Sequence, residues 1–376
     1  MKILKAYKTE LDPNNKQRAF FRQCAGTARF VFNWALADRQ QRYKDGFKTS
    51  HYEQCKRFNS LKREQCPWIL DIPYAVTASA FANCDSAFQH FFRRVKNGDT
   101  PGYPKFKARG GRDSFQLRST RVYRDRVRLT HVGLVKLKER DYIPVSANRY
   151  GNYATVSKRA GRWFISVLVE EEMAQIETSG KVVGVDFGVK DLAVCSNGKV
   201  FENPRHIKRA ERRLARLQRE LARRTKGGAN RKKTKAKLQR AHFDVANARQ
   251  HTQHQISSYL THKLRPSVIV LEDLNVSGMM KNHHLAQAIG DVGFYELRRQ
   301  IEYKAQWCGI EVVLADMWYP STKTCSQCGA HKPEITLQHR VYHCDHCGLE
   351  INRDLNAARN LAALVKGETR PDCLGS

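Results

Sequence analysis

Three acidic residues interrupt or end apolar segments that lie far apart in this chain. Asp186 lies inside VVGVDFGVK, Glu272 ends VIVLE, and Asp354 opens DLNAARNLA. A lone carboxylate in an apolar segment is unfavourable, because desolvating an unpaired charge costs several kcal/mol. The fold must therefore compensate these charges, and a shared divalent cation would do so for all three.

The order of the apolar segments from Lys181 onward predicts an α/β fold. We expect strands at 181–189, 191–196, 199–202, 267–272 and 311–316. We expect helices within 205–262, at 293–308 and from Asp354. Three strands followed by alternating helices and strands are typical of the ribonuclease H-like fold. That order would bring the three acids together.

Carboxylate oxygens suit hard cations such as Mg²⁺ or Mn²⁺. In two-metal phosphodiester hydrolysis a carboxylate bridges two ions roughly 4 Å apart, and we expect Asp186 to be that bridge. For any one acid alone, an ordinary hydrogen-bonded or Arg-paired strand-end acid is an equal alternative. Asp273 competes with Glu272, and strand alternation puts the two on opposite faces, so only one can point at Asp186. We choose Glu272 by its place in the motif. Asp191 and Asp316 fit strand-edge or loop acids better.

Two CxxC pairs predict a structural zinc site. Cys325 and Cys328 are separated by fifteen residues from Cys344 and Cys347, a spacing typical of four-thiolate zinc ribbons. Four free thiols in a loop are the weaker alternative. Several histidines close by could replace a ligand: His331, His339, His343 and His346.

The charge of the chain indicates a polyanionic partner. Its 67 Lys and Arg against 36 Asp and Glu give a net charge of +31, which favours nucleic acid. A membrane surface is the competing explanation, but no apolar run approaches the roughly 20 residues that span a bilayer. The opening MKILKAYKTEL lacks the apolar core of a signal peptide. The unpatterned remaining cysteines favour a reducing cytoplasm.

Basic residues concentrate in two regions. Residues 205–240 should form part of two antiparallel basic helices that turn at Gly227-Gly228. In residues 93–112, basic side chains are interleaved with Tyr103 and Phe106. These two aromatic residues suit either stacking on nucleobases or core packing. Before this second cluster, residues 15–95 predict a helical bundle broken near Gly46 and Pro67. Residues 114–172 predict a β-barrel that the first strand completes.

The chain contains the motifs VGVDFGVK, LEDLN, CSQCG…CDHCG and NRDLNAARNLA, preceded by ARFVFNWAL, FFRRVKNGDTPGYPKFKARG and WYPSTKTC. In this set of motifs it resembles the transposon-associated TnpB proteins. The resemblance spans Lys2 to about Val365. It implies an RNA-guided DNA endonuclease with a RuvC-like nuclease domain related to type V CRISPR effectors. In this reading a guide RNA from the transposon end pairs with double-stranded target DNA, which is cut beside a short adjacent motif.

By the same resemblance, Asp186, Glu272 and Asp354 carry over as catalytic acids for two Mg²⁺ or Mn²⁺ ions. The four cysteines carry over as ligands of one structural Zn²⁺. Asn352 departs from the family, where many members have an acid two residues before the catalytic Asp. The helix at 74–80 lacks a Gln often seen there, which leaves motif-reading residues unassigned.

The resemblance also implies domain boundaries and a cellular setting. The first β-barrel (wedge) strand is expected at 1–14, a helical recognition domain at 15–113 and the rest of the wedge domain at 114–178. A RuvC-like nuclease domain is expected at 179–318 and 351–366. Between its two parts, a zinc ribbon that binds target nucleic acid is expected at 319–350, and a tail follows at 367–376. We expect a monomeric ribonucleoprotein in the prokaryotic cytoplasm, associated with the nucleoid and not with a membrane. A guided DNA-binding regulator that does not cut and a transposase that transfers strands are the alternatives.

Overall fold

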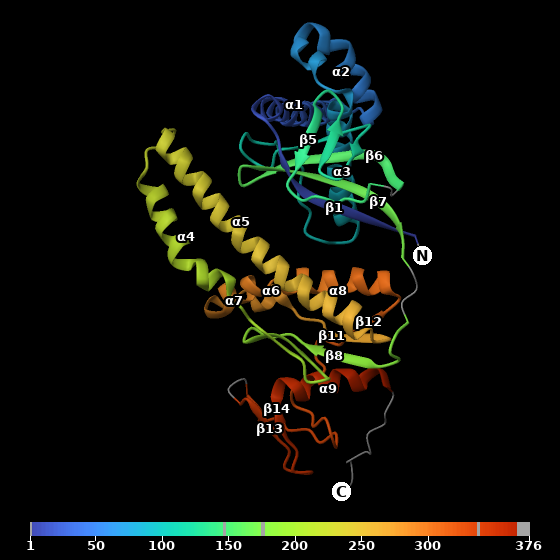
Figure 1. Ribbon diagram of the computed structural model, residues 1–376, viewed down its shortest axis with the longest axis vertical. Coiled ribbons are helices and arrows are strands. Elements are labelled where there is room, and N and C mark those ends of the chain that lie inside the picture. Colours follow the sequence, from blue (N-terminus) through green and yellow to red (C-terminus); the bar gives the residue numbers. More distant parts are fainter. Residues whose placement is uncertain (1, 146–147, 174–176, 337–338, 367–376) are drawn as a thin grey trace. The chain divides into compact units, whose positions relative to one another are not determined.

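The computed structural model describes residues 2–145, 148–173, 177–336 and 339–366 (Figure 1). The chain forms two compact units, one spanning Lys2–Glu172 and the other beginning at Met173. The expected tail at 367–376 lies outside the described residues.

A seven-stranded antiparallel sheet is the centre of the first unit. Its strands are β1 (Lys2–Asp12), β2 (Ser114–Leu117), β3 (Arg121–Val122), β4 (Arg126–Leu129), β5 (Gly133–Leu137), β6 (Asn148–Arg159) and β7 (Arg162–Glu172), in the order β2-β6-β7-β1-β5-β4-β3. The first strand joins this sheet as expected, because β1 pairs with β7 on one side and β5 on the other. No ladder joins β2 to β3 among the described residues, so strand pairing does not close the sheet into a ring.

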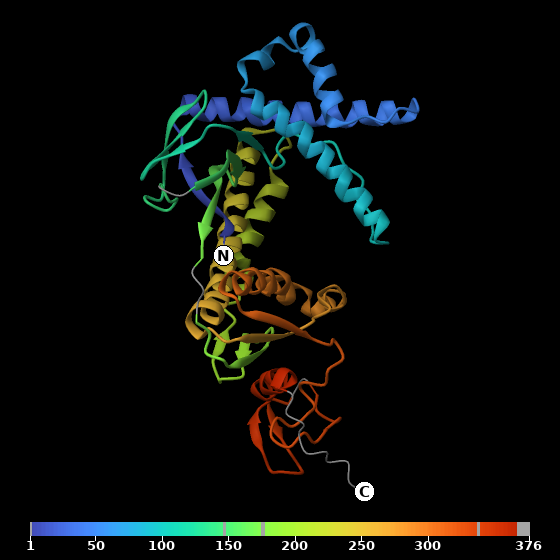
Figure 2. The ribbon, with the colours of Figure 1, turned by 90° about the vertical axis from the view of Figure 1, so that its right-hand side faces the viewer.

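The helices of this unit are α1 (Asn15–Lys44), α2 (His51–Gln65), the 3₁₀ turn η1 (Pro67–Asp71) and α3 (Tyr74–Lys96). Figure 2 shows α1 as one long helix crossed by α3. The expected breaks are present: Gly46 follows α1 at a φ of +83°, and Pro67 opens η1. A buried cluster that includes Val31, Phe58 and Phe81 holds the helices together.

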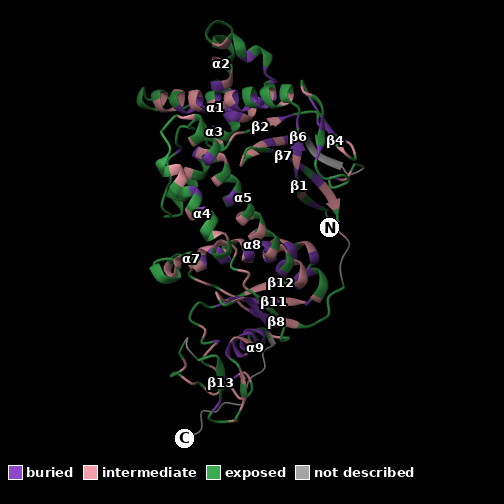
Figure 3. Ribbon diagram, turned by 60° about the vertical axis from the view of Figure 1, so that its left-hand side comes forward, coloured by how far each residue is buried: buried purple, intermediate pink, exposed green. Residues whose placement is uncertain are grey.

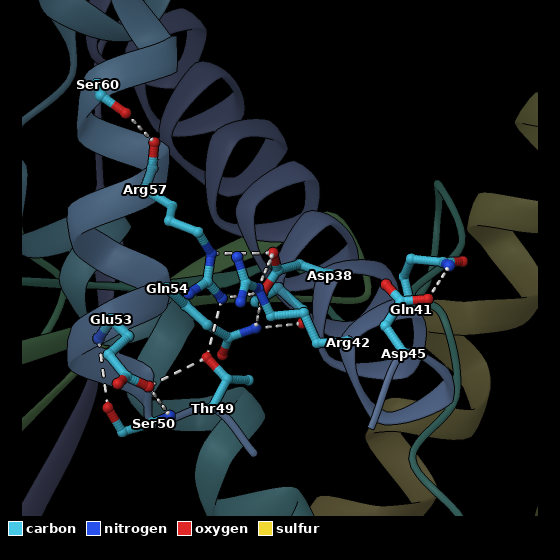
Figure 4. A network of polar contacts seen from close by, with 11 residues as sticks. Asp38, Gln41, Arg42, Asp45, Thr49, Ser50, Glu53, Gln54, Arg57 and Ser60 are labelled. Atoms are coloured by element: carbon cyan, nitrogen blue, oxygen red, sulfur yellow. Dashed lines mark hydrogen bonds and ion pairs between the residues drawn. The ribbon is translucent and has the colours of Figure 1, made fainter. Parts of the chain in front are cut away.

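A polar network fixes the beginning of α2 against α1 (Figure 4). Arg57 Nη2 donates to Asp38 Oδ2 at 2.6 Å, and Gln54 Nε2 donates to the carbonyl of Ala35 at 2.7 Å. Ser50 and Glu53 form a capping box at the start of α2. Gln54 Nε2 and the Arg57 guanidinium of α2 therefore find partners on α1.

The second unit contains a five-stranded sheet made of β8 (Val182–Asp186), β9 (Asp191–Cys195), β10 (Val200–Glu202), β11 (Val268–Glu272) and β12 (Glu311–Ala315). The order is β10-β9-β8-β11-β12, with antiparallel pairs among the first three strands and parallel pairs from β8 to β12. All five strands lie within the predicted segments.

Helices cover both faces of this sheet (Figure 1). They are α4 (His206–Arg223), α5 (Ala229–Ser258), the π-helical continuation η2 (Tyr259–Leu264), α6 (Val276–Met279), α7 (His283–Val292), α8 (Phe294–Cys308) and α9 (Arg353–Lys366). Alternate strand residues such as Val185 and Leu271 pack with α5 and α8, whereas Val270 packs with Leu361 of α9. In Figure 3, α9 is largely purple, the colour of buried residues.

The antiparallel pair α4 and α5 confirms the expected basic hairpin, with Gly227 in the turn at a φ of +86°. The short helices α6 and α7 were not expected from the sequence.

The two strands β13 (Val341–His343) and β14 (Glu350–Asn352) form a separate small sheet that leads directly into α9. Figure 2 shows this ribbon beside α9. Across the described ranges, no helix has the length and apolar character that crossing a bilayer requires.

Candidate functional site

Two of the three predicted acids end neighbouring parallel strands. Asp186 is the last residue of β8, and Glu272 is the last residue of β11. The strands pair in register, with Val185 opposite Leu271, so the two acids leave the sheet at the same edge and level. Strand alternation puts them on the face of Gly184 and Val270, which is the face that α9 covers.

The third acid, Asp354, lies in the first turn of α9. This helix packs tightly on β8 because Gly184 has no side chain: a Cβ there would lie 2.1 Å from the carbonyl oxygen of Ala358 and 2.5 Å from the nitrogen of Ala362. The helix backbone occupies the space that a side chain would need. Gly184 thereby allows the helix to bring its first turn to the edge where Asp186 lies.

Electrostatics indicate that the three acids lie close together. Burial first, and then the negative charges of Glu272 and Asp354, raise the pKa of Asp186 well above the usual aspartate value, while Arg353 opposes the rise. Arg353 is 7% exposed, and its Nη2 donates to Asp354 Oδ1 at 2.9 Å. Asp186 is therefore the half-buried centre of the group, and its two acidic neighbours oppose its ionisation.

The competing acids have other partners. Asp273 lies on the α8 side, where Arg298 Nη1 donates to its Oδ1 at 2.6 Å. Asp316 accepts from the backbone N–H of Trp318 at 2.7 Å, a local turn contact. Asp191 begins β9, the strand next to β8. The choice of Glu272 over Asp273 thus agrees with the face on which each side chain lies.

The donor set suits a hard divalent cation. All three side chains offer oxygen, and a cation would offset both the burial of Asp186 and the repulsion from its neighbours. Ligand atoms of three or more acids, histidines or cysteines gather within 4.8 Å at one place in the described chain, and that place is the cysteine cluster. The three carboxylates do not reach that spacing, and one oxygen each of Glu272 and Asp354 accepts a hydrogen bond from Ser321 and Arg353.

The cysteine cluster has the geometry of a zinc site. The Sγ atoms of Cys325 and Cys347 are 3.6 Å apart, as are those of Cys328 and Cys344. A zinc ion at about 2.3 Å from four sulfurs requires sulfur–sulfur edges of about 3.8 Å. Burial alone would raise the pKa of Cys344, but backbone N–H groups of Cys347 and His346 lower it to about 7. The cluster contains the four cysteines and none of the neighbouring histidines.

The basic hairpin carries far more positive than negative charge. Within residues 206–258, all of them described, Glu220 pairs with Arg224 at 3.1 Å and Asp244 with Arg213 at 3.9 Å. The remaining Lys and Arg residues of α4 and α5 outnumber these acidic residues. This excess suits contacts with phosphates.

The two aromatic residues of the second basic cluster differ in their packing. Tyr103 packs edge-on against Phe88 and Phe91, which is core packing, although it stays 47% exposed. Phe106 is 55% exposed. Lys107 Nζ lies 3.7 Å from the centre of the Phe32 ring.

Sequence reasoning missed several polar residues around the acids. Ser321 Oγ donates to Glu272 Oε1 at 2.7 Å, and Arg353 contacts Asp354. Asn356 and Asn360 are fully buried in α9. One signal was present: two asparagines four residues apart on the same face as buried alanines and leucines indicate polar partners in the core.

Three family models match separate segments of the chain. The OrfB_IS605 family, described as "Probable transposase", matches residues 154–283. A "Cas12f1-like, TNB domain" matches residues 294–361, and a "Helix-turn-helix domain" of OrfB_IS605 matches residues 1–48.

Relatives from several bacteria align with most of the chain. A "Putative RNA-guided DNA endonuclease" of Streptomyces pristinaespiralis is 33% identical over 366 residues, or 96% of this chain and 89% of the relative. The "Putative RNA-guided DNA endonuclease InsQ" of Escherichia coli (strain K12) is 32% identical over 96% of this chain and 92% of the relative. The solved "Cas12f1-sgRNA-target DNA complex" contains a chain of the same fold, with a TM-score of 0.58 and 13% identity over 96% of this chain and 99% of that one.

Proposed function

Because this chain belongs to the OrfB/TnpB family of transposon-associated proteins, we propose that it is an RNA-guided DNA endonuclease. The resemblance to TnpB proteins expected from the motifs is confirmed by these relatives. The proposed reaction is hydrolysis of phosphodiester bonds in double-stranded target DNA next to a short adjacent motif, under the direction of a guide RNA from the transposon end.

One observation carries the proposal: Asp186 and Glu272 end paired parallel strands at one level, and α9, which carries Asp354 in its first turn, packs on the same face of the sheet. Burial, and then the charges of Glu272 and Asp354, raise the pKa of Asp186 accordingly. A half-buried acid beside two other acids is unfavourable without a compensating cation, and perturbed pKa values of this kind concentrate at functional sites. Asp186, Glu272 and Asp354 are the proposed catalytic acids and ligands.

Two Mg²⁺ or Mn²⁺ ions are the proposed cofactors. When bound, such ions activate the attacking water and neutralise charge on the leaving oxygen. The protein supplies the rest: β8 and β11 present two carboxylates at one level, and α9 presents the third. Asp186, which interacts with both other acids, is suited to the bridging position.

We assign the domains of the chain from its membership in the OrfB/TnpB family. Residues 179–318 and 351–366 form the proposed RuvC-like nuclease domain, into which a zinc ribbon at 319–350 is inserted. The four cysteines are the proposed ligands of Zn²⁺, supported by their sulfur spacing. Residues 1–14 and 114–178 form the proposed wedge domain, with the recognition helices at 15–113.

The basic hairpin and the net charge of +31 support backbone contacts with RNA and DNA. Base pairing with the guide would then supply the sequence readout that the protein does not. We propose a monomeric ribonucleoprotein that acts in the prokaryotic cytoplasm.

The direct test compares the wild-type protein with Asp186→Ala, each purified with its cotranscribed RNA. The wild-type complex should cut matching double-stranded DNA in Mg²⁺. The variant should bind the same DNA without cutting it, because the carboxylate needed to hold the cations is gone. Undiminished cutting by the variant would show that the assigned site is wrong.

The same experiment separates the alternatives. A guided regulator would bind DNA without cutting in both forms, and a strand-transfer enzyme would join a supplied transposon end to the target. Breaks without joining support the nuclease.

A further inference from the structure

Ser321 contacts a proposed catalytic acid from outside the predicted site. It lies in the loop between β12 and the first cysteine pair, and it is 2% exposed. Its hydroxyl donates to Glu272 Oε1 at 2.7 Å. This hydrogen bond joins residues that are 49 positions apart in the sequence.

The backbone of Ser321 is held on both sides. Its N–H donates to the carbonyl of Tyr319 at 2.8 Å, and its own carbonyl accepts from Asn360 Nδ2 at 2.6 Å. Asn360 is fully buried in α9. A hydroxyl on so constrained a backbone has a fixed direction, which a surface serine would lack.

The same helix holds the loop that follows Ser321. Asn360 Nδ2 also donates to the carbonyl of Thr324 at 2.6 Å, and Asn356 Nδ2 donates to that carbonyl at 2.7 Å. The N–H of Ser326 donates to Asn356 Oδ1 at 2.8 Å. Helix α9 therefore carries Asp354 at its start and, with two buried amides, fixes the loop that carries Ser321.

We propose that Ser321 is a positioning residue for Glu272 and that Asn360 orients it. The proposal rests on the function proposed above. Glu272 and Asp186 end paired strands at the same level, so two ionised carboxylates there would repel each other and turn away from a shared cation. The Ser321 hydroxyl binds one oxygen and leaves Oε2 for a cation. Hydrogen bonds of this kind to ligating carboxylates change metal affinity or activity by about 10- to 100-fold.

The primary experiment measures Mn²⁺ binding, because it needs neither guide nor DNA. Titrations followed by electron paramagnetic resonance should give a dissociation constant about 10- to 100-fold higher for Ser321→Ala than for wild type. Ser321→Thr keeps the hydroxyl and should restore most of the affinity. Asn360→Ala keeps the Ser321 hydroxyl but removes the hydrogen bond that holds the Ser321 carbonyl. It should therefore also weaken Mn²⁺ binding.

Thr322→Val provides the matched control, since Thr322 is the next residue in the loop and makes no hydrogen bond to Glu272 in the described part of the chain. It should bind Mn²⁺ as wild type does. Cleavage by the guided complex gives a second reading: Ser321→Ala should need more Mg²⁺ for half-maximal rate yet approach the wild-type rate when Mg²⁺ is saturating.

A lower melting temperature with unchanged Mn²⁺ affinity in Ser321→Ala would make Ser321 merely structural and overturn the proposal. So would an equal loss of affinity in Thr322→Val. These outcomes are separate from failure of the endonuclease function, which would appear as wild-type protein that binds Mn²⁺ normally but never cuts guided DNA.

Discussion

Replacing Gly184 by alanine would place a methyl group inside the contact between β8 and α9. The new Cβ would lie 2.1 Å from the carbonyl oxygen of Ala358, whereas ordinary contacts begin at 3.4 Å. The helix must therefore retreat by about 1.3 Å, the difference of these two distances. Backbone atoms cannot rotate away as a side chain can, so the whole helix has to move.

That movement should affect both stability and catalysis. Overpacking of a core typically costs about 1–3 kcal/mol, and a unit of this size loses roughly 2–4 °C of melting temperature per kcal/mol. The start of α9 carries Asp354, and a misplacement of about 1 Å can lower a rate by about 100-fold. We therefore expect Gly184→Ala to melt about 2–12 °C lower and to cut guided DNA about 100-fold more slowly.

Gly290→Ala is the matched control. Gly290 lies within α7, and a Cβ there would meet only Met280 Cε, at 3.8 Å. A helical glycine replaced by alanine without a clash stabilises a protein by about 0.4–1 kcal/mol. In calorimetry, Gly290→Ala should therefore melt slightly higher than wild type and Gly184→Ala lower. In single-turnover cleavage, only Gly184→Ala should be slower. A Gly184→Ala protein with wild-type melting and cleavage would refute the inference that α9 lies directly on β8.

Three further outcomes follow from the charges and the thiolates. Because burial and neighbouring acids raise the pKa of Asp186, the folded protein holds this proton more tightly than the unfolded one. In Mg²⁺-free buffer its contribution to stability should be full below the unfolded aspartate pKa and lost as pH rises through the folded value; melting curves of Asp186→Asn should lack that loss, and a parallel pH response would contradict it. Burial lowers the pKa of Lys304 to about 8, although its ammonium donates to Ser257 and Ser258. Wild-type stability should therefore rise by about 3 kcal/mol from pH 8 to 10.5 relative to Lys304→Met, and equal denaturant midpoints across this range would exclude it. Cys344→Ser should lose the bound zinc and expose residues 319–350 to protease, because binding of structural zinc is coupled to folding; retained zinc, measured by mass spectrometry, would argue against the four-thiolate site.

Local sequence pattern was sufficient to predict the five strands of the second sheet and the face on which each acid lies. The apolar runs of β8 and β11 end at Asp186 and Glu272, and strand alternation separates Glu272 from Asp273 without any knowledge of tertiary contacts. The cysteine pairs were equally readable, since zinc coordination depends on spacing that the chain itself carries. Periodicity reports which face a residue occupies, and that was enough to bring the acids to one edge.

Periodicity does not report which distant residue a face will meet. The contact of Ser321 with Glu272 depends on the path of the loop after β12, and that path is set by Asn356 and Asn360 of α9. The need for glycine at position 184 appears only when the backbone of α9 is in place. The sequence alone thus determined the chemistry of the site, whereas tertiary packing decided which neutral side chains hold it, because hydrogen bonds between distant segments leave no local pattern.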